Sequence, residues 1–148
     1  MTLSNRTTQV RTATVQLMNV SSNDLAVVDF PDAQSLALEN DQIRSWGDRS
    51  QTWVLASQPR TAVTDADVVV LKPGEQREIT VNFALPRWFV TNGQTPAQAL
   101  RDVTSGNMFR LIYRPPSRAE CRNLTHAALI WHGELPSAAF SSGSGRVD

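Results

Sequence analysis

The amino-acid sequence predicts an all-β fold, in which two antiparallel sheets pack into a sandwich and one short helix is inserted near residues 95–104. Three observations predict it. Short runs of alternating apolar and polar residues recur along the chain, which is the period-2 signature of half-buried strands. Clusters of turn-forming residues separate these runs. The composition is rich in serine and threonine and only 19% charged, below the ~25% of ordinary soluble domains.

The first predicted strand covers residues 11–18, where apolar residues at every second position alternate with threonine and glutamine. The serine, asparagine and aspartate cluster at 21–24 predicts a turn. A second strand is expected over residues 25–30, and Pro31 ends it.

Residues 32–53 allow two interpretations. Their apolar residues mark two strands separated by a bend, or they line one face of a helix that ends at Gly47. We prefer the two strands, because the apolar run W-V-L at 53–55 follows closely and the neighbouring segments are predicted to be β.

The most specific local pattern is a turn between two strands, at residues 67–71 and 77–83. Pro73 fixes φ at the second position of a turn, and Gly74 can adopt the positive φ that the third position of a type II turn requires. Apolar residues alternate with polar ones after the turn. The sequence therefore predicts two strands joined by a tight turn.

The inserted helix is predicted over residues 95–103. Thr95 is a natural N-cap, Pro96 suits the first helical position, and Gln98 completes a capping box. Gly106 stands where a C-terminal glycine ends a helix. We expect this helix to cover one open end of the sandwich.

Two more strands complete the prediction, at residues 108–113 and 127–135. We expect one β-sandwich domain over residues 11–140. Residues 1–10 are expected to form an N-terminal arm, and residues 141–148 have the composition of a flexible tail.

The segment 68–140 resembles an immunoglobulin-like β-sandwich. The resemblance is carried by an L-x-P-G-E turn at 71–75, the alternating strand at 79–83, G-N-M-F-R-L-I-Y at 106–113, and W-H-G-E-L-P-S at 131–137. It implies that these segments are late strands of the sandwich, with their aromatic residues in or beside the core. It says little about function, because such sandwiches serve as adhesive, structural, inhibitory and accessory modules. The inserted helix departs from the simple pattern.

Charge and targeting signals narrow the possible partners and compartments. The formal net charge is zero, so the chain lacks the basic stripe that nucleic-acid binding needs. Residues 1–9 are polar, unlike a signal peptide, and no run approaches the ~20 apolar residues of a membrane span. The chain is expected to stay in its producer's cytoplasm, or to be a form whose leader has been removed. Cys121 is the only cysteine, so the paired cysteines of disulfide-linked immunoglobulin domains are missing.

Few residues offer catalytic or metal-binding chemistry. The only histidines are His126 and His132, and on one extended strand they would lie ~20 Å apart, too far to share a metal. Cys121 and His126 are a possible nucleophile and base, but they fall in a polar loop, so coincidence is the better interpretation. We predict no catalytic residue, no metal site and no cofactor.

Two pairs of aspartates are candidate calcium ligands. Asp65 lies two positions before Asp67, and Asp29 lies three positions before Asp32. Carboxylates in a loop are ligands that calcium prefers, but neither pair matches the calcium-loop pattern. We therefore expect turn-forming aspartates.

The predicted contact surface consists of Trp88 and Phe89, with Arg87 beside them. These residues follow a predicted strand and precede a polar T-N-G, which favours a half-exposed apolar loop. Trp53 and Trp131 lie within predicted strands and are expected in the core.

The sequence favours a non-catalytic structural or interaction module, built into a larger assembly such as a virion, a surface layer or a fibre. Its partners would be proteins, by self-association or with assembly neighbours, and not nucleic acid. Two alternatives remain. One is a module that binds a carbohydrate or another ligand through Trp88 or Trp46; the other is a hydrolase that uses Cys121 or the aspartate pairs.

Overall fold

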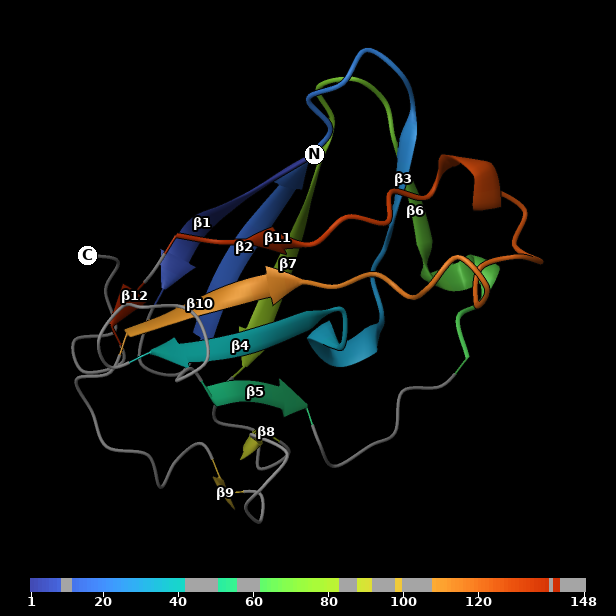
Figure 1. The fold of residues 1–148 in the computed structure, drawn as a ribbon. Coiled ribbons are helices and arrows are strands. Elements are labelled where there is room, and N and C mark those ends of the chain that lie inside the picture. Colours follow the sequence, from blue (N-terminus) through green and yellow to red (C-terminus); the bar gives the residue numbers. More distant parts are fainter. Residues whose placement is uncertain are drawn as a thin grey trace.

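The structure is a computed structural model, shown as a ribbon in Figure 1. The residues that it describes are 1–8, 12–41, 51–55, 62–82, 88–91, 98–99, 108–138 and 140–141.

The strands in chain order are β1 (Thr2–Thr8), β2 (Thr12–Met18), β3 (Leu25–Val28), β4 (Leu36–Asp41), β5 (Gln51–Leu55), β6 (Val68–Leu71), β7 (Gln76–Asn82), β8 (Trp88–Thr91), β9 (Gln98–Ala99), β10 (Met108–Tyr113), β11 (Leu135–Pro136) and β12 (Phe140–Ser141). The short 3-10 helices are η1 (Pro31–Ala33), η2 (Asp65–Asp67) and η4 (Ala127–Leu129).

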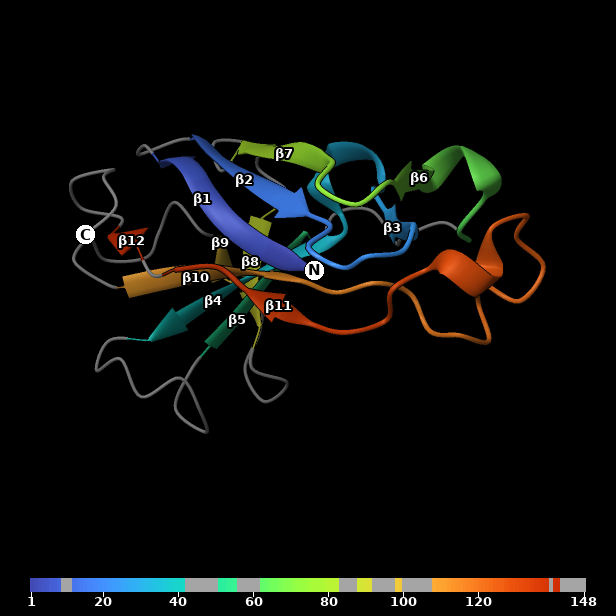
Figure 2. The same cartoon turned by 90° about the horizontal axis from the view of Figure 1, so that it is seen from above.

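These strands pair antiparallel throughout, which confirms the all-β prediction. One sheet has the order β1-β2-β7, a second consists of β3 and β6, and the largest has the order β11-β10-β4-β5-β8-β9, with β12 also paired to β10. Figure 2 shows β1, β2 and β7 lying across one face of the largest sheet. The first strand of the preferred interpretation of residues 32–53 is confirmed, because β4 covers residues 36–41 and pairs with β5. Residues 42–50, where the second strand was expected, lie outside the described residues.

Two distant segments of the chain form one continuous antiparallel ribbon. In it β2 pairs with β7, and β3, which follows β2, pairs with β6, which precedes β7. The tight turn between β6 and β7 has the predicted form: the Glu75 N–H donates to the Lys72 carbonyl at 2.9 Å, and Gly74 has φ 84. The two strands that it joins pair with other strands and not with each other.

Asn19 holds the ribbon together where β2 passes into β3. Its side chain is fully buried. The side-chain amide donates to the carbonyls of Leu71 and Asn23, each at 2.8 Å. The side-chain oxygen accepts from the Ser21 N–H at 3.0 Å and from the Ser21 hydroxyl at 2.7 Å. All four hydrogen-bonding positions of the side chain are therefore used.

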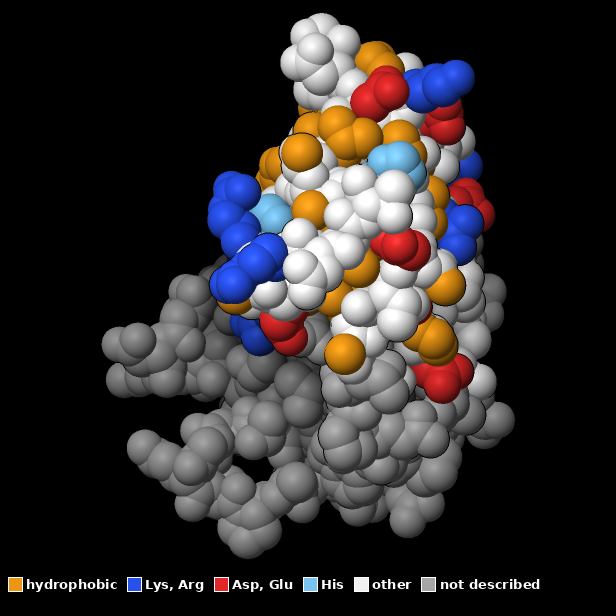
Figure 3. All heavy atoms as spheres, turned by 90° about the vertical axis from the view of Figure 1, so that its right-hand side faces the viewer, with side chains coloured by type: hydrophobic (Ala, Val, Ile, Leu, Met, Phe, Trp, Pro, Cys, Tyr) orange, Lys and Arg blue, Asp and Glu red, His pale blue; other side chains and the backbone are white. Residues whose placement is uncertain are grey.

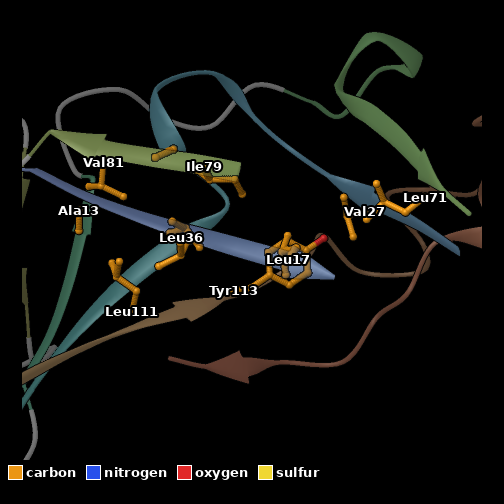
Figure 4. Packing of buried hydrophobic residues seen from close by; sticks show 11 residues of the cluster. Ala13, Leu17, Val27, Leu36, Leu71, Ile79, Val81, Leu111 and Tyr113 are labelled. Atoms are coloured by element: carbon orange, nitrogen blue, oxygen red, sulfur yellow. The ribbon is translucent and has the colours of Figure 1, made fainter. Parts of the chain in front are cut away.

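The main core lies between the three-stranded sheet and strands β4 and β10 (Figure 4). The alternating sequences of β2 and β7 supply one side of it, as periodicity predicts. Its buried residues are Ala13, Val15, Leu17, Val27, Ala33, Leu36, Leu71, Ile79, Val81, Leu111 and Tyr113.

Tyr113 joins the main core to β3. The ring is fully buried, and the hydroxyl oxygen accepts the Val28 N–H at 2.9 Å. Trp131 stacks on the ring at a centroid distance of 6.3 Å and an interplanar angle of 23°. Burial raises the pKa of Tyr113 to about 12.

Titration of this hydroxyl is expected to lower stability in strong base. The pKa of an unfolded tyrosine is about 10, so the contribution is complete below pH ~10 and is lost as the pH rises through 12. The shift corresponds to about 2–3 kcal/mol of unfolding free energy. Tyr113 is the only tyrosine, so tyrosinate absorbance reports on it alone. A folded protein that titrates near pH 10 would contradict this burial.

A second core lies at the end of the molecule that carries β3 and β6. It consists of Ala26, Val28, Phe30, Cys121 and Ile130, with partly buried valines and leucines around it. Successive side chains of β3 point into different cores: Val27 belongs to the first, and Ala26 and Val28 belong to the second.

Two expected segments, the arm at 1–10 and the helix at 95–103, differ from the structure. Residues 1–10 were expected to form an arm, but β1 pairs with β2, because Leu3 packs against the main core. The helix predicted at 95–103 is wrong at Gln98 and Ala99, which form β9 and pair with β8. The rest of that range lies outside the described residues. So does the predicted tail from residue 142 on. A helix of about two turns depends on tertiary contacts, so its cap signals did not suffice.

The strand predicted at 127–135 is also wrong. Its first part forms η4, Ile130 makes a single parallel bridge to Ala26, and only Leu135 and Pro136 pair with β10. The apolar run there fills two separate cores, since Ile130 enters the second and Trp131 packs on the first.

Candidate functional site

The predicted contact surface belongs to a strand and not to a loop. Trp88 and Phe89 begin β8, whose backbone pairs opposite Leu55 and Val54 of β5. The loop prediction is therefore wrong. The run W-F-V-T combines aromatic and β-branched residues, which favour strands, and it pairs with β5. Arg87 lies outside the described residues, and a contact role for these three residues stays a prediction.

The best-defined candidate surface is the long connection between β10 and β11, residues 114–134. It contains only the short helix η4, and connections of this length are uncommon unless they have a function. Ser117 and Glu120 begin it with a reciprocal pair of bonds: the Ser117 N–H donates to the Glu120 carboxylate at 2.7 Å, and the Glu120 N–H donates to the Ser117 hydroxyl at 3.2 Å. Figure 3 shows this end of the molecule, with apolar side chains and both histidines on it.

Cys121 anchors the middle of the connection. Its side chain is 1% exposed and lies in the second core. Its N–H donates to the carbonyls of Ser117 and Arg118, each at 3.2 Å. His126 is exposed at the start of η4. A thiol buried in apolar surroundings is less reactive than one at the surface.

Alkylation of Cys121 is expected to be at least about tenfold slower than that of a small free thiol at neutral pH, because the reagent needs a local opening to reach the sulfur. Mass spectrometry after timed quenching with iodoacetamide gives the rate. Urea sufficient to unfold the protein should restore the rate of the small thiol. Labelling of the folded protein as fast as that of the small thiol would contradict the buried position.

Asp65 clamps the far side of the connection to η2. Its carboxylate accepts the Thr125 N–H and the Thr125 hydroxyl, each at 2.8 Å. The backbone hydrogen bond from Thr125, followed by the hydroxyl bond, lowers the pKa of Asp65. Asp67, two residues later, accepts from the Thr64 N–H at 3.0 Å and from its hydroxyl at 3.2 Å.

Replacement Asp65→Asn is expected to increase tryptic cleavage at the exposed Arg118 and Arg122 several-fold, because the charged acceptor for Thr125 is lost. Timed digestion with mass spectrometry measures the cleavage. Asp67→Asn is the matched control: it changes an aspartate of the same turn whose side-chain bonds stay within that turn. Equal cleavage of both variants would contradict a specific clamp.

The remaining candidates also take part in local structure. His132 Nδ1 lies 3.0 Å from the Pro116 carbonyl oxygen. The Asp29 carboxylate accepts a hydrogen bond from Arg77 Nε at 2.9 Å, and Arg77 Nη2 forms an ion pair with the same oxygen at 2.9 Å. Trp131 packs on the main core as expected, whereas for Trp53 only the backbone is placed, in β5, and Trp46 lies outside the described residues. Within the described part of the chain, no three histidine, cysteine, aspartate or glutamate side chains are grouped to hold a metal ion.

Sequence reasoning missed Asn19 and the pair Asp65 and Thr125. Both depend on contacts between distant parts of the chain, and no local pattern marks them. The apolar run V-V-V-L of β6 was visible, but only the sheet order shows that it forms an edge.

No helix in the described part is both long and apolar enough to cross a membrane. No family model, curated protein or solved structure was found to match the chain.

Proposed function

We propose that the chain is an immunoglobulin-like β-sandwich that acts as a non-catalytic interaction module within a larger assembly. The packing of β2 and β7 against β4 and β10 supports the sandwich part of the proposal. The observation that carries the interaction part is the fixed conformation of the connection 114–134.

Three separate attachments hold that connection against the sheets. Cys121 lies in the second core, Asp65 binds Thr125, and the Trp131 N–H donates to the Ala26 carbonyl at 2.9 Å. A loop held in one conformation presents a surface to a partner without a large loss of conformational entropy on binding. The Asp65 carboxylate and the Thr125 hydroxyl form hydrogen bonds that hold the loop in place. This structural use of the polar groups favours recognition over catalysis.

The size of the native complex tests this function. An extract of the native source is separated by size exclusion under mild conditions, and the chain is detected with an antibody. We expect it in fractions far larger than its own 16.3 kDa, together with cross-linked protein neighbours identified by mass spectrometry. Elution as a monomer without cross-linked neighbours would overturn the proposal.

A further inference from the structure

The outer edge of β6, the side of this strand that faces away from β3, has an orientation that the hydrogen bonds define. The Asp29 N–H donates to the Asp67 carbonyl at 2.8 Å. In an antiparallel pair the backbone groups alternate in direction, so the odd-numbered residues of β3 and β6 bond to each other. The N–H and C=O groups of Val68 and Val70 therefore point away from β3.

The opposite side of this two-stranded sheet is closed. The Val28 N–H donates to the Tyr113 hydroxyl at 2.9 Å, and the Ser35 hydroxyl donates to the Val28 carbonyl at 2.7 Å. The Ala26 carbonyl accepts from Trp131. These bonds also confirm the alternation, because even-numbered residues of β3 point away from β6. Among the outward groups, the Val68 N–H donates to the Asp65 carbonyl at the end of η2. Across the described residues, no comparable bond reaches the Val68 carbonyl or the N–H and C=O groups of Val70.

The side chains of β6 do nothing to block pairing. Exposed edge strands are usually protected by charged residues, prolines or bulges. Strands β1 and β7, which form the edges of the three-stranded sheet, carry Arg6 and the pair Arg77 and Glu78. Strand β6 reads V-V-V-L, without charge or proline, and its three valines are only partly buried.

We propose that β6 pairs antiparallel with β6 of a second copy of the chain, about a twofold axis that passes beside Val69. The inference deepens the proposed function and rests on it, since it names a partner and a surface. The pairing would join two β3-β6 sheets into one four-stranded sheet across the interface.

The geometry of β6 is self-complementary for this pairing. A twofold axis at Val69 places Val68 of each copy opposite Val70 of the other. Both residues direct their backbone groups outward. Because the Val68 N–H is already bonded to the Asp65 carbonyl, the Val70 N–H of each copy donates to the Val68 carbonyl of the other, which gives two intermolecular bonds in all. An isologous interface requires this match of a surface with itself.

The charges that flank β6 are complementary in the same arrangement. The antiparallel direction brings Lys72, at the end of each strand, alongside η2 of the other copy. Asp65 and Asp67 give that turn a negative charge, and Lys72 is exposed and is the only lysine of the chain. Opposite charges at both ends favour this register over a parallel one, in which like charges would meet.

Sedimentation velocity of the purified chain over a wide concentration range tests the inference. We expect a concentration-dependent dimer. Val70→Pro removes an outward N–H from each copy while leaving the bonds to β3 intact, and proline is tolerated at such edge positions. The loss of two intermolecular bonds should weaken dimerisation at least about tenfold. Val69→Pro is the matched control: it removes an N–H that bonds to β3, so it should destabilise the monomer itself.

A second variant keeps the test decisive if Val70→Pro fails to fold. Lys72→Glu changes an exposed side chain, and it should weaken the dimer several-fold at low salt and much less at high salt. A wild-type chain that stays monomeric at every concentration would overturn the inference. So would dimerisation that neither folded variant weakens, because another surface would then hold the copies together. Neither result overturns the proposed function, which the experiment on the native extract tests separately, because that experiment also detects partners other than a second copy.

Discussion

Replacement of Asn19 by alanine is expected to lower the free energy of unfolding by about 3–4 kcal/mol. The side chain makes four hydrogen bonds in a fully buried position. Alanine removes all four and leaves a cavity beside carbonyl groups, such as that of Leu71, that water reaches poorly. A buried polar group left without its partner costs about 1–3 kcal/mol, so the loss exceeds that of an ordinary surface substitution. Urea unfolding followed by tryptophan fluorescence measures it.

Asn23→Ala is the control for this result. Asn23 is an exposed asparagine of the same turn, and it contributes its backbone carbonyl to Asn19. Its replacement should change stability by no more than about 0.5 kcal/mol. If Asn19→Ala were as mild as Asn23→Ala, the network around Asn19 would not hold the two halves of the ribbon together.

Replacement of Gly133 by alanine is expected to cost about 2–3 kcal/mol. A Cβ added at this position would lie 2.9 Å from Cε2 of Trp131 and closer still to the outer atoms of the ring. Either the backbone or the indole must move, and the indole is stacked on Tyr113. Thermal or urea unfolding measures the cost, and near-UV circular dichroism reports whether the Tyr113–Trp131 arrangement survives.

A double-mutant cycle isolates the cause. In a Trp131→Ala background the ring is absent, so Gly133→Ala should cost less than about 0.5 kcal/mol. An equal cost in both backgrounds would locate the effect of Gly133 in the backbone, and the close approach of the indole would not explain it.

Local patterns predicted the parts of the fold that local physics determines. The turn at Pro73 and Gly74 formed as expected, because the φ preferences of the two residues decide its type. The alternation in β2 and β7 also identified which side chains enter the core.

Predictions failed where distant contacts decide the structure. The cap residues at Thr95 and Gln98 favoured a helix, but pairing with β8 places Gln98 in a strand. Trp88 was expected in a loop, because nothing in the neighbouring sequence shows that it would pair with β5. The candidate surface was predicted only in part: the polar loop around Cys121 and His126 was expected, but its attachment through Asp65 was not.

The continuous ribbon of β2-β3 against β6-β7 has a consequence for how the protein folds. Pairing of these strands closes a loop that contains β4 and β5. A local hairpin or helix therefore cannot start the ribbon, and the first pair must overcome the entropy of closing that loop. Pairing of Val28 with Val68 closes the shortest such loop, and each step toward Thr12 and Asn82 extends it at little further entropic cost. Folding dominated by such non-local pairs is slow, in the range of milliseconds to seconds. During that interval both edges of β6 lie open. During synthesis β2 and β3 emerge before Val68, so they must wait for β6 and β7 before they can pair.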